Sequence, residues 1–180
     1  SSEYKKLGLE YIEINLSVSQ CMHHGLADSI LESMSRYGVS SNQVNLEITE
    51  SAASYDQSVM SENLERLSAA GLTFSLDDYG TGYSNMYRIA ALPLKIVKLD
   101  KTFVNNQNSK MWTILQNTDR MIKDLNKEIV VEGIETEEMV KKFSDLKCDF
   151  IQGYFFSKPI PQREFVEFID RWNNRQKVNA

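Results

Sequence analysis

The sequence has 180 residues, of which 42% are hydrophobic and 25% are charged, which predicts one globular domain and argues against intrinsic disorder. Its 20 Lys and Arg against 25 Asp and Glu give a formal net charge of −5, whereas a general binder of nucleic acid polymers or anionic membranes needs a basic surface. No apolar run approaches the roughly 18 residues of a membrane span, and the opening SSEYKKLGLE has no apolar stretch typical of a secretory signal. Cys21 and Cys148 form no CxxC pair and are typical of reduced thiols. We therefore expect a cytoplasmic segment without membrane contact, and leave a membrane anchor elsewhere in a longer parent chain open.

Short runs of β-branched and aromatic residues predict six strands, at residues 11–14, 44–48, 73–76, 96–99, 129–131 and 150–151. Apolar residues at helical spacing lie between and after these runs, at 26–34, 60–67, 111–125, 139–146 and 165–172. Gly38 and Gly71 are typical stops for the first two helices, Thr136 is a candidate N-cap, and Pro161 suits the start of the last helix. We interpret all five apolar stripes as core packing.

Strands that alternate with helices predict a parallel sheet covered by helices, of the α/β class. Two architectures satisfy this pattern, an open doubly wound sheet and a closed barrel. No GxGxxG motif follows the first strand, which weakens the dinucleotide-binding form of the open sheet.

Every predicted strand ends on a polar residue that could do chemistry. Taken one at a time, such residues are most often caps, turn residues or solvated charges. Six consecutive strand ends of this kind are harder to explain by stability alone. In a (β/α) barrel all of them converge on one face, whereas in an open sheet only those near a switch point can meet. The residues are Asn15, Glu47 with Glu50, Asp77 with Asp78, Lys98 with Asp100, Glu132 with Glu135, and Gln152.

The donor types predict the chemistry of this face. Carboxylates and amides without His or Cys select hard divalent ions, Mg²⁺ or Mn²⁺ with Ca²⁺ as an inhibitory competitor, rather than zinc. Adjacent Asp77 and Asp78 could serve two ions that activate a water and clamp a phosphodiester. Lys98 could orient that water or stabilise charge on phosphate oxygens. His23 and His24 have polar neighbours and are interpreted as surface residues.

Five segments together make the sequence strongly similar to one family. They are INLSV, LEITES, DDYGTGYSNM with the following ALPLKIVKLDKTFV, VVEGIETEE and QGYFFSKPIP, and they run from Ile14 to Pro161. In this order they resemble the EAL domain family of cyclic di-GMP phosphodiesterases, and the combination is highly specific. The resemblance implies a modified TIM barrel that cleaves one phosphodiester of cyclic di-GMP, using Mg²⁺ or Mn²⁺, to give linear pGpG.

The resemblance also implies roles for the polar strand ends. Asn15, Glu47 and Asp77 would bind the first metal, with Asp77 bridging to a second metal that Asp78 and Glu132 complete. Lys98 and Gln152 would hold the attacking water, with Glu132 also counted as catalytic. Glu50 would support catalysis by pinning the loop at 78–82, which the family uses for metal binding and dimer contacts. Asp100 and Glu135 would lie on the substrate side. Tyr79 stands where the family usually has Phe.

One family element has no counterpart in these residues. The strand with the Glu-Ala-Leu motif supplies a metal-binding Glu, and an Arg near it contacts substrate phosphate; neither can be located before Asn15. A barrel of this type usually needs about 250 residues. We therefore predict that residues 1–180 form a single EAL-type barrel domain that lacks about two N-terminal strands. A homodimer, and sensor or GGDEF domains in a longer parent chain, are the partners that the resemblance implies.

Three functions are compatible with these residues. A catalytic phosphodiesterase is favoured for the parent protein, because every catalytic position of the family that can be located carries the family's residue. A non-catalytic cyclic di-GMP receptor is the alternative, and it gains weight for the 180 residues alone because one metal ligand is missing. A metal-dependent barrel enzyme acting on enolates or sugar phosphates fits the donor set, but the combined motifs argue against it.

Overall fold

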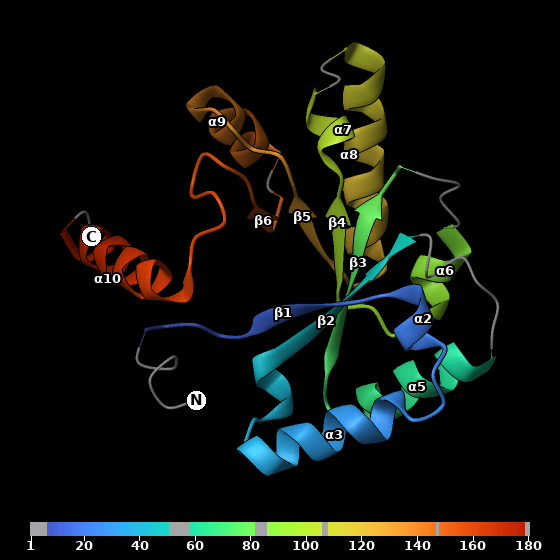
Figure 1. Cartoon of the computed structure of the whole chain (residues 1–180). Coiled ribbons are helices and arrows are strands. Elements are labelled where there is room, and N and C mark those ends of the chain that lie inside the picture. The colour runs from blue at the N-terminus through green and yellow to red at the C-terminus, as the bar shows by residue number, and fades with distance from the viewer. Residues whose placement is uncertain (1–6, 51–57, 82–85, 106–107, 147, 179–180) are drawn as a thin grey trace.

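The computed structural model describes residues 7–50, 58–81, 86–105, 108–146 and 148–178. A parallel sheet with the strand order β1-β2-β3-β4-β5-β6 forms the centre of the molecule (Figure 1). The order follows the chain without any reversal, which is the topology of a (β/α) barrel and not of a doubly wound sheet. The strands are β1 (Ile12–Leu16), β2 (Val44–Thr49), β3 (Thr73–Tyr79), β4 (Ile96–Leu99), β5 (Glu128–Val131) and β6 (Phe150–Ile151).

Helices connect successive strands, as the apolar spacing predicted. Gly38 ends α3 in the left-handed conformation, at φ 61°, and the Thr136 side chain caps α9 by accepting a hydrogen bond from the Met139 amide. Three short helices, α2, α6 and α7, were not predicted. The helices are α2 (Val18–Cys21), α3 (Leu26–Tyr37), α5 (Ser58–Ala69), α6 (Met86–Ala91), α7 (Lys101–Asn105), α8 (Ser109–Asp124), α9 (Glu137–Asp145) and α10 (Gln162–Val178), with a 3₁₀ turn, η1, at Ser41–Gln43. Within the described residues, no helix is both long and apolar enough to cross a membrane.

The two faces of the sheet have opposite character. One face is apolar and, on the central strands, buried against the helices; Phe74 on β3 and Leu99 on β4 are both 0% exposed and belong to one core cluster with Leu64 of α5 and Ile122 of α8. The other face is polar because side chains alternate along each strand. Parallel pairing sets Glu47 beside both Asn15 and Ser75 in register, so the polar positions of neighbouring strands share this face. The polar face corresponds to the inside of a barrel.

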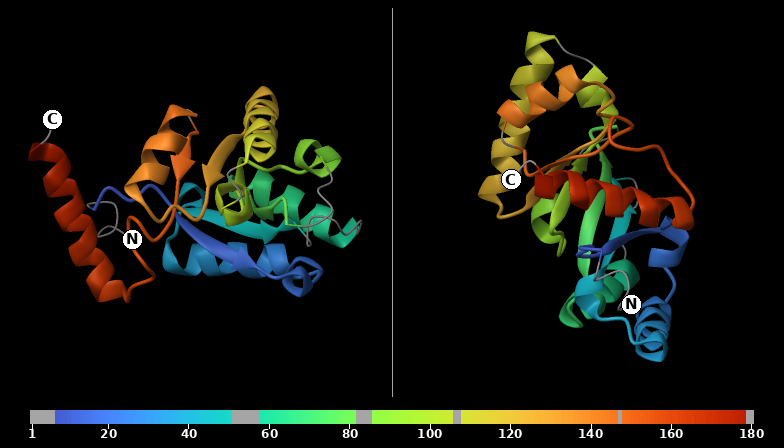
Figure 2. Two further views of the ribbon diagram at one scale, coloured as in Figure 1. Left: turned by 90° about the horizontal axis from the view of Figure 1, so that it is seen from above. Right: turned by 90° about the vertical axis from the view of Figure 1, so that its left-hand side faces the viewer.

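The sheet curls so that its two edge strands line one cavity. This cavity, of about 480 Å³, lies between Ile12 and Glu13 on β1, Phe150 and Ile151 on β6, and Phe165 of α10. Near it, α10 contacts the start of the described chain, where Asn173 Nδ2 donates to the Leu7 carbonyl over 2.8 Å (Figure 2). Within the described residues, β1 and β6 each pair with one strand and not with each other. The predicted barrel class is confirmed, and the sheet is a barrel wall that is not closed.

Candidate active site

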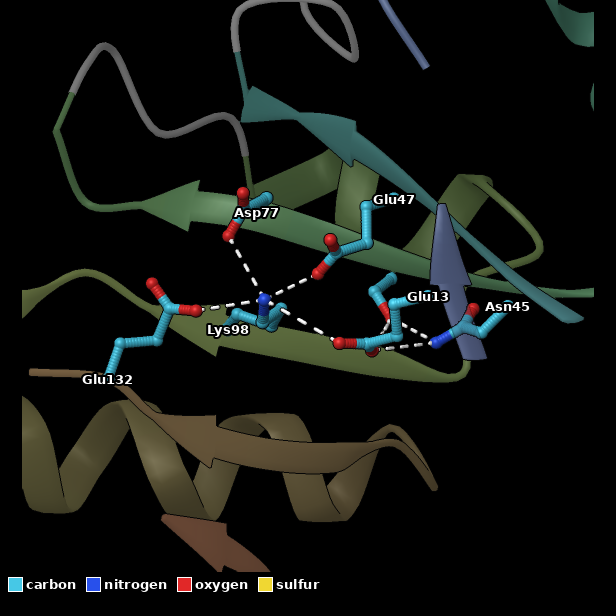
Figure 3. A network of polar contacts seen from close by, with 7 residues as sticks. Glu13, Asn45, Glu47, Asp77, Lys98 and Glu132 are labelled. Carbon is cyan, nitrogen blue, oxygen red and sulfur yellow. Dashed lines mark hydrogen bonds and ion pairs between the residues drawn. The ribbon is translucent and has the colours of Figure 1, made fainter. Parts of the chain in front are cut away.

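The ammonium of Lys98 lies at the centre of the polar face. Lys98 is on β4 and only 4% exposed, and its Nζ lies 2.9 Å from Glu132 Oε1, 3.7 Å from Asp77 Oδ1 and 3.8 Å from Glu13 Oε2. It also donates a hydrogen bond to Glu47 Oε1. Figure 3 shows these four carboxylates pointing at Lys98 from different elements. The structure therefore brings together Glu47, Asp77, Lys98 and Glu132, which the strand pattern had placed on one face.

The electrostatics of the cluster favour an additional cation. Burial raises the pKa of Glu47 and of Glu132, although the Lys98 ammonium pulls both pKa values down. Burial, and then the neighbouring charge of Asp77, raise the pKa of Asp78. Burial by itself would lower the pKa of Lys98, but its hydrogen bonds to Glu132 and Glu47 outweigh this, so its pKa is raised and Lys98 stays charged. One ammonium does not neutralise this many acids, so divalent ions would find a favourable potential here.

Three acids form a group that could hold a metal ion. Ligand atoms of Asp77, Asp78 and Glu132 all lie within 4.8 Å of one another. Asp77 Oδ1 is buried and has no hydrogen-bond partner among the described residues, so it retains a lone pair for an ion. All of the donors are oxygens, as Mg²⁺ and Mn²⁺ prefer. The site therefore fits the predicted type of metal.

The backbone of β3 explains how two consecutive residues can join one cluster. Successive side chains of a regular strand point to opposite faces. The pairing of β3 with β4 is irregular between Leu76 and Tyr79, and Asp78 lies there in the left-handed region, at φ 56°. This irregularity turns Asp78 toward the side of Asp77. Backbone conformations that are rare for residues other than Gly often mark functional sites.

A cavity of about 320 Å³ opens beside the cluster. Its lining includes the predicted residues Asp78, Asp100, Glu132, Glu135 and Gln152. These residues come from four strand ends, which the structure brings together at this one cavity.

Tight contacts at the ends of β5 and β6 shape this cavity. Gly133 lies at φ 78°, and a Cβ at this position would clash with the Lys101 side chain. A Cβ on Gly153 would lie 2.1 Å from the Ile134 carbonyl oxygen. Lys101 and Tyr154 also line the cavity and were missed in the sequence. The sequence feature that could have indicated them is their position next to predicted site residues, since Lys101 follows Asp100 and Tyr154 lies two residues after Gln152.

Other predicted residues hold less central positions. Asn15 lies beside Glu47 in register, but its side chain is exposed. Glu47 is not one of the three clustered acids, and its carboxylate accepts a hydrogen bond from Lys98. One oxygen of Asp100 accepts a hydrogen bond from the Thr102 amide, over 2.8 Å, at the start of α7. His23 and His24 are exposed, as predicted.

Glu50 contacts the loop that follows β3. It is 6% exposed, and its Oε2 accepts a hydrogen bond from the Gly80 amide over 3.0 Å. Tyr79, in the same segment, stacks on Phe103 of α7 with the ring centroids 6.5 Å apart. Residues 82–85, which include the end of the predicted loop, lie outside the described residues.

Glu13 is the functional candidate that the sequence reasoning missed. It lies two residues before Asn15 on β1, so the period of two in a strand places both on the polar face. That spacing was the available signal. Its contacts with Lys98, Asn45 and Ser75 are part of the network in Figure 3.

Comparison with known proteins agrees with this geometry. Residues 3–159 match the family model described as the EAL domain. The bifunctional diguanylate cyclase/cyclic di-GMP phosphodiesterase MucR of Pseudomonas aeruginosa is 35% identical over 160 residues, which cover 88% of this chain and 23% of MucR. The chain thus spans less than a quarter of that relative.

Solved structures of a cyclic di-GMP phosphodiesterase, an EAL domain and a c-di-GMP complex superpose on the chain. The PaMucR phosphodiesterase in complex with c-di-GMP has a TM-score of 0.80 at 35% identity, over 86% of this chain and 64% of that one. The EAL domain of Mycobacterium smegmatis DcpA has a TM-score of 0.85 at 28% identity, over 94% and 78%. Klebsiella pneumoniae BlrP1 in a manganese/cy-diGMP complex has a TM-score of 0.78 at 26% identity, over 88% and 41%.

Proposed function

Since the chain belongs to the EAL domain family, we propose that the protein carrying it hydrolyses cyclic di-GMP to linear pGpG with Mg²⁺ or Mn²⁺. The observation that carries the proposal is the buried Lys98 ammonium among carboxylates of several strands, directly beside the group of Asp77, Asp78 and Glu132. Such a centre can hold metal ions and a water next to a phosphodiester. The relatives named for this activity, and the manganese and c-di-GMP bound to BlrP1, support the choice of substrate and metal.

The residues divide the work according to where they lie. Asp77, Asp78 and Glu132 would hold the metal ions together with Glu47 and Asn15. Bound divalent ions would supply the charge that makes water acidic and neutralises phosphate oxygens. Lys98 and Gln152 would hold the attacking water.

The rim of the site would act on the substrate and on the β3 loop. Asp100 and Glu135 line the cavity where a substrate would lie, and Lys101 adds a cation suited to phosphate. Glu50 would hold the loop after β3 in place through the Gly80 amide.

A non-catalytic receptor is the second candidate. It is favoured by Glu47, whose carboxylate binds Lys98 and lies outside the acid group. A turnover assay on the full-length gene product decides between the two. We expect pGpG to appear with Mg²⁺ or Mn²⁺ and to disappear when Ca²⁺ replaces them. Binding of cyclic di-GMP without pGpG under either metal would establish the receptor function instead.

The barrel and its assembly are part of the proposal. We propose that further strands pair with the edges of β1 and β6 and complete one EAL-type barrel domain with residues 1–180. The unclosed wall and its shared edge cavity support this. A homodimer and additional sensor or GGDEF domains are also proposed; the name of MucR as a bifunctional cyclase and phosphodiesterase supports the latter.

A further inference from the structure

Glu13 is the fourth carboxylate around Lys98, and hydrogen bonds from two buried side chains hold it in place. Its Oε1 accepts hydrogen bonds from Asn45 Nδ2 over 3.1 Å and from Ser75 Oγ over 3.2 Å. Asn45 and Ser75 are both 0% exposed, and Asn45 also donates to Ser75, so this support is rigid. The other oxygen, Oε2, faces Lys98 Nζ at 3.8 Å (Figure 3).

Glu13 differs from the other three carboxylates in what it can reach. Glu47, Asp77 and Glu132 are the proposed ligands of divalent ions. Ions that bind there would draw these carboxylates away from Lys98 or share their charge. Glu13 is hydrogen-bonded to Asn45 and Ser75, and it is not a member of the acid group of Asp77, Asp78 and Glu132.

When divalent ions occupy the site, the Lys98 ammonium would require another carboxylate as its counter-ion. At 4% exposure its ammonium is largely shielded from bulk water, and an unpaired charge in such a place is strongly unfavourable. Divalent ions a few ångströms away would also repel it. A carboxylate that stays in place offsets both effects and fixes the direction in which the ammonium points.

We propose that Glu13 is the positioning residue of Lys98, the counter-ion that keeps the ammonium in place while Glu47, Asp77 and Glu132 serve the metal ions. This deepens the proposed function and rests on it. Glu13 touches neither the substrate cavity nor the acid group, so it acts through Lys98. A purely structural role, in which Glu13 only holds Asn45 and Ser75 together, is the competing explanation.

The substitution Glu13→Gln separates the two explanations. Gln keeps an acceptor oxygen for Asn45 and Ser75 and keeps the shape of the side chain, but it removes the charge that faces Lys98. Glu128→Gln is the matched control, because Glu128 lies at the start of β5 in a surface ion pair with Lys95, 3.5 Å long. Both variants, together with Lys98→Gln and the double variant Glu13→Gln/Lys98→Gln, are made in the full-length gene product.

The first measurement is Mn²⁺ binding by calorimetry without substrate. Glu13→Gln should weaken Mn²⁺ binding by about 10-fold or more, since loss of an outer partner of a metal site has effects of this size. The same substitution should cause a clearly smaller loss when Lys98 is already Gln, because no ammonium remains to be held. Equal losses in the two backgrounds would overturn the proposal and make Glu13 a general source of negative charge. Unchanged Mn²⁺ binding in the single variant would overturn it as well.

The second measurement is turnover of cyclic di-GMP. Glu13→Gln should lower kcat by about 10- to 100-fold with KM unchanged, while Glu128→Gln should match the wild type. A structural role predicts instead a lower melting temperature with kcat retained, and that result would overturn the proposal. If Glu13→Gln weakens Mn²⁺ binding more when Lys98 is present than when it is Gln, but the wild type makes no pGpG, the role of Glu13 stands and the proposed hydrolysis fails.

A third measurement does not depend on any variant. In a crystal structure of the Mn²⁺-loaded protein, Lys98 Nζ should lie within hydrogen-bonding distance of Glu13, about 3 Å. A Lys98 side chain turned away from Glu13 in that structure would overturn the proposal even if Glu13→Gln failed to fold.

Discussion

The central strands and the edge strands of the sheet differ in how completely they form the site. On β2 to β5, Glu47 and Lys98 are buried and in contact, and Asp77 and Glu132 point at the same ammonium. On the edge strand β1, Asn15 is exposed, and so is Gln152, which follows β6. A strand with two neighbours has its register and side-chain directions fixed from both sides, whereas an edge strand is fixed from one side only. The difference indicates that the central strands set up most of the charge pattern of the site, to which β1 adds Glu13.

Apolar exposure shows the same contrast. Ile14 on β1 is 44% exposed and Phe150 on β6 is 50% exposed, whereas Leu46 on β2 and Val97 on β4 are at most 1% exposed. Exposed apolar side chains on strands that have an unpaired side favour association with another chain. The central strands therefore hold most of the cluster around Lys98, while the edges carry the tendency to associate.

The strongest test of the centre removes a metal ligand. Asp77→Ala should abolish Mn²⁺ binding and turnover together, because it removes the carboxylate shared by the acid group and the Lys98 network. We expect a loss beyond the roughly 10- to 100-fold that follows from removing an outer partner of a metal site. Calorimetry and a pGpG assay measure the two effects. The control is Asp124→Ala on α8, which breaks only an exposed pair with Arg120; turnover retained by Asp77→Ala would remove this residue from the metal site. Glu47→Ala should likewise abolish Mn²⁺ binding and turnover together.

Lys98→Ala should separate binding from chemistry. Turnover should fall by about 10²- to 10⁴-fold, the range for a group that assists proton transfer or positions a reacting water. Affinity for cyclic di-GMP measured with Ca²⁺ should remain largely intact, since Lys98 is not among the residues that line the cavity. Lys95→Ala, on the surface just before β4, is the matched control. A large loss of affinity in Lys98→Ala would reassign this residue to binding of the ground-state phosphate.

The edges can be tested by comparing two isoleucines of similar exposure. Residues 1–180 expressed alone should associate, with activity far below that of the full-length protein, because β1 and β6 have unpaired sides. Ile14→Lys should shift the chain toward the monomer in size-exclusion chromatography. Ile114→Lys on α8, where the wild-type residue is 49% exposed against 44% for Ile14, should leave association unchanged. A fully active, stable monomer of residues 1–180 would show that no further strand is needed.

Much of the centre followed from the sequence, because strand periodicity and parallel topology are enough to assign residues to faces. Alternation along LEIT put Glu47 on the opposite face from Leu46 and Ile48, and the order of strands brought Glu47, Asp77, Lys98 and Glu132 together. The six strands lie where they were predicted, with shifts at their ends. The longer β3 is the largest shift, and it includes Asp77 and Asp78.

The remaining features depend on side-chain competition and backbone irregularity, which no spacing rule contains. Whether Glu47 binds Lys98 or a metal is decided by their mutual distance and burial. The turn of Asp78 toward Asp77 needs the register shift in β3, and the sequence DDYG predicts only a turn. Glu13 lies inside β1 and not at its end, and its contact with Lys98 depends on how the sheet curls, which strand spacing does not predict.

Cys148, just before the edge strand β6, gives the mildest test of whether the edge is ordered. Burial raises the pKa of this thiol to about 11. Its pKa in the unfolded chain is about 8.5, so between these values the unfolded state loses a proton that the folded state keeps. Stability should therefore decline modestly as the pH rises above about 8.5, and at that pH iodoacetamide should alkylate folded Cys148 at least about tenfold more slowly than the unfolded thiol. Mass spectrometry after timed alkylation measures the rate, and Cys148→Ser should remove its part of the pH dependence. Alkylation at the unfolded rate would mean that the start of β6 opens freely in solution, and that the contrast between centre and edge is larger than the structure indicates.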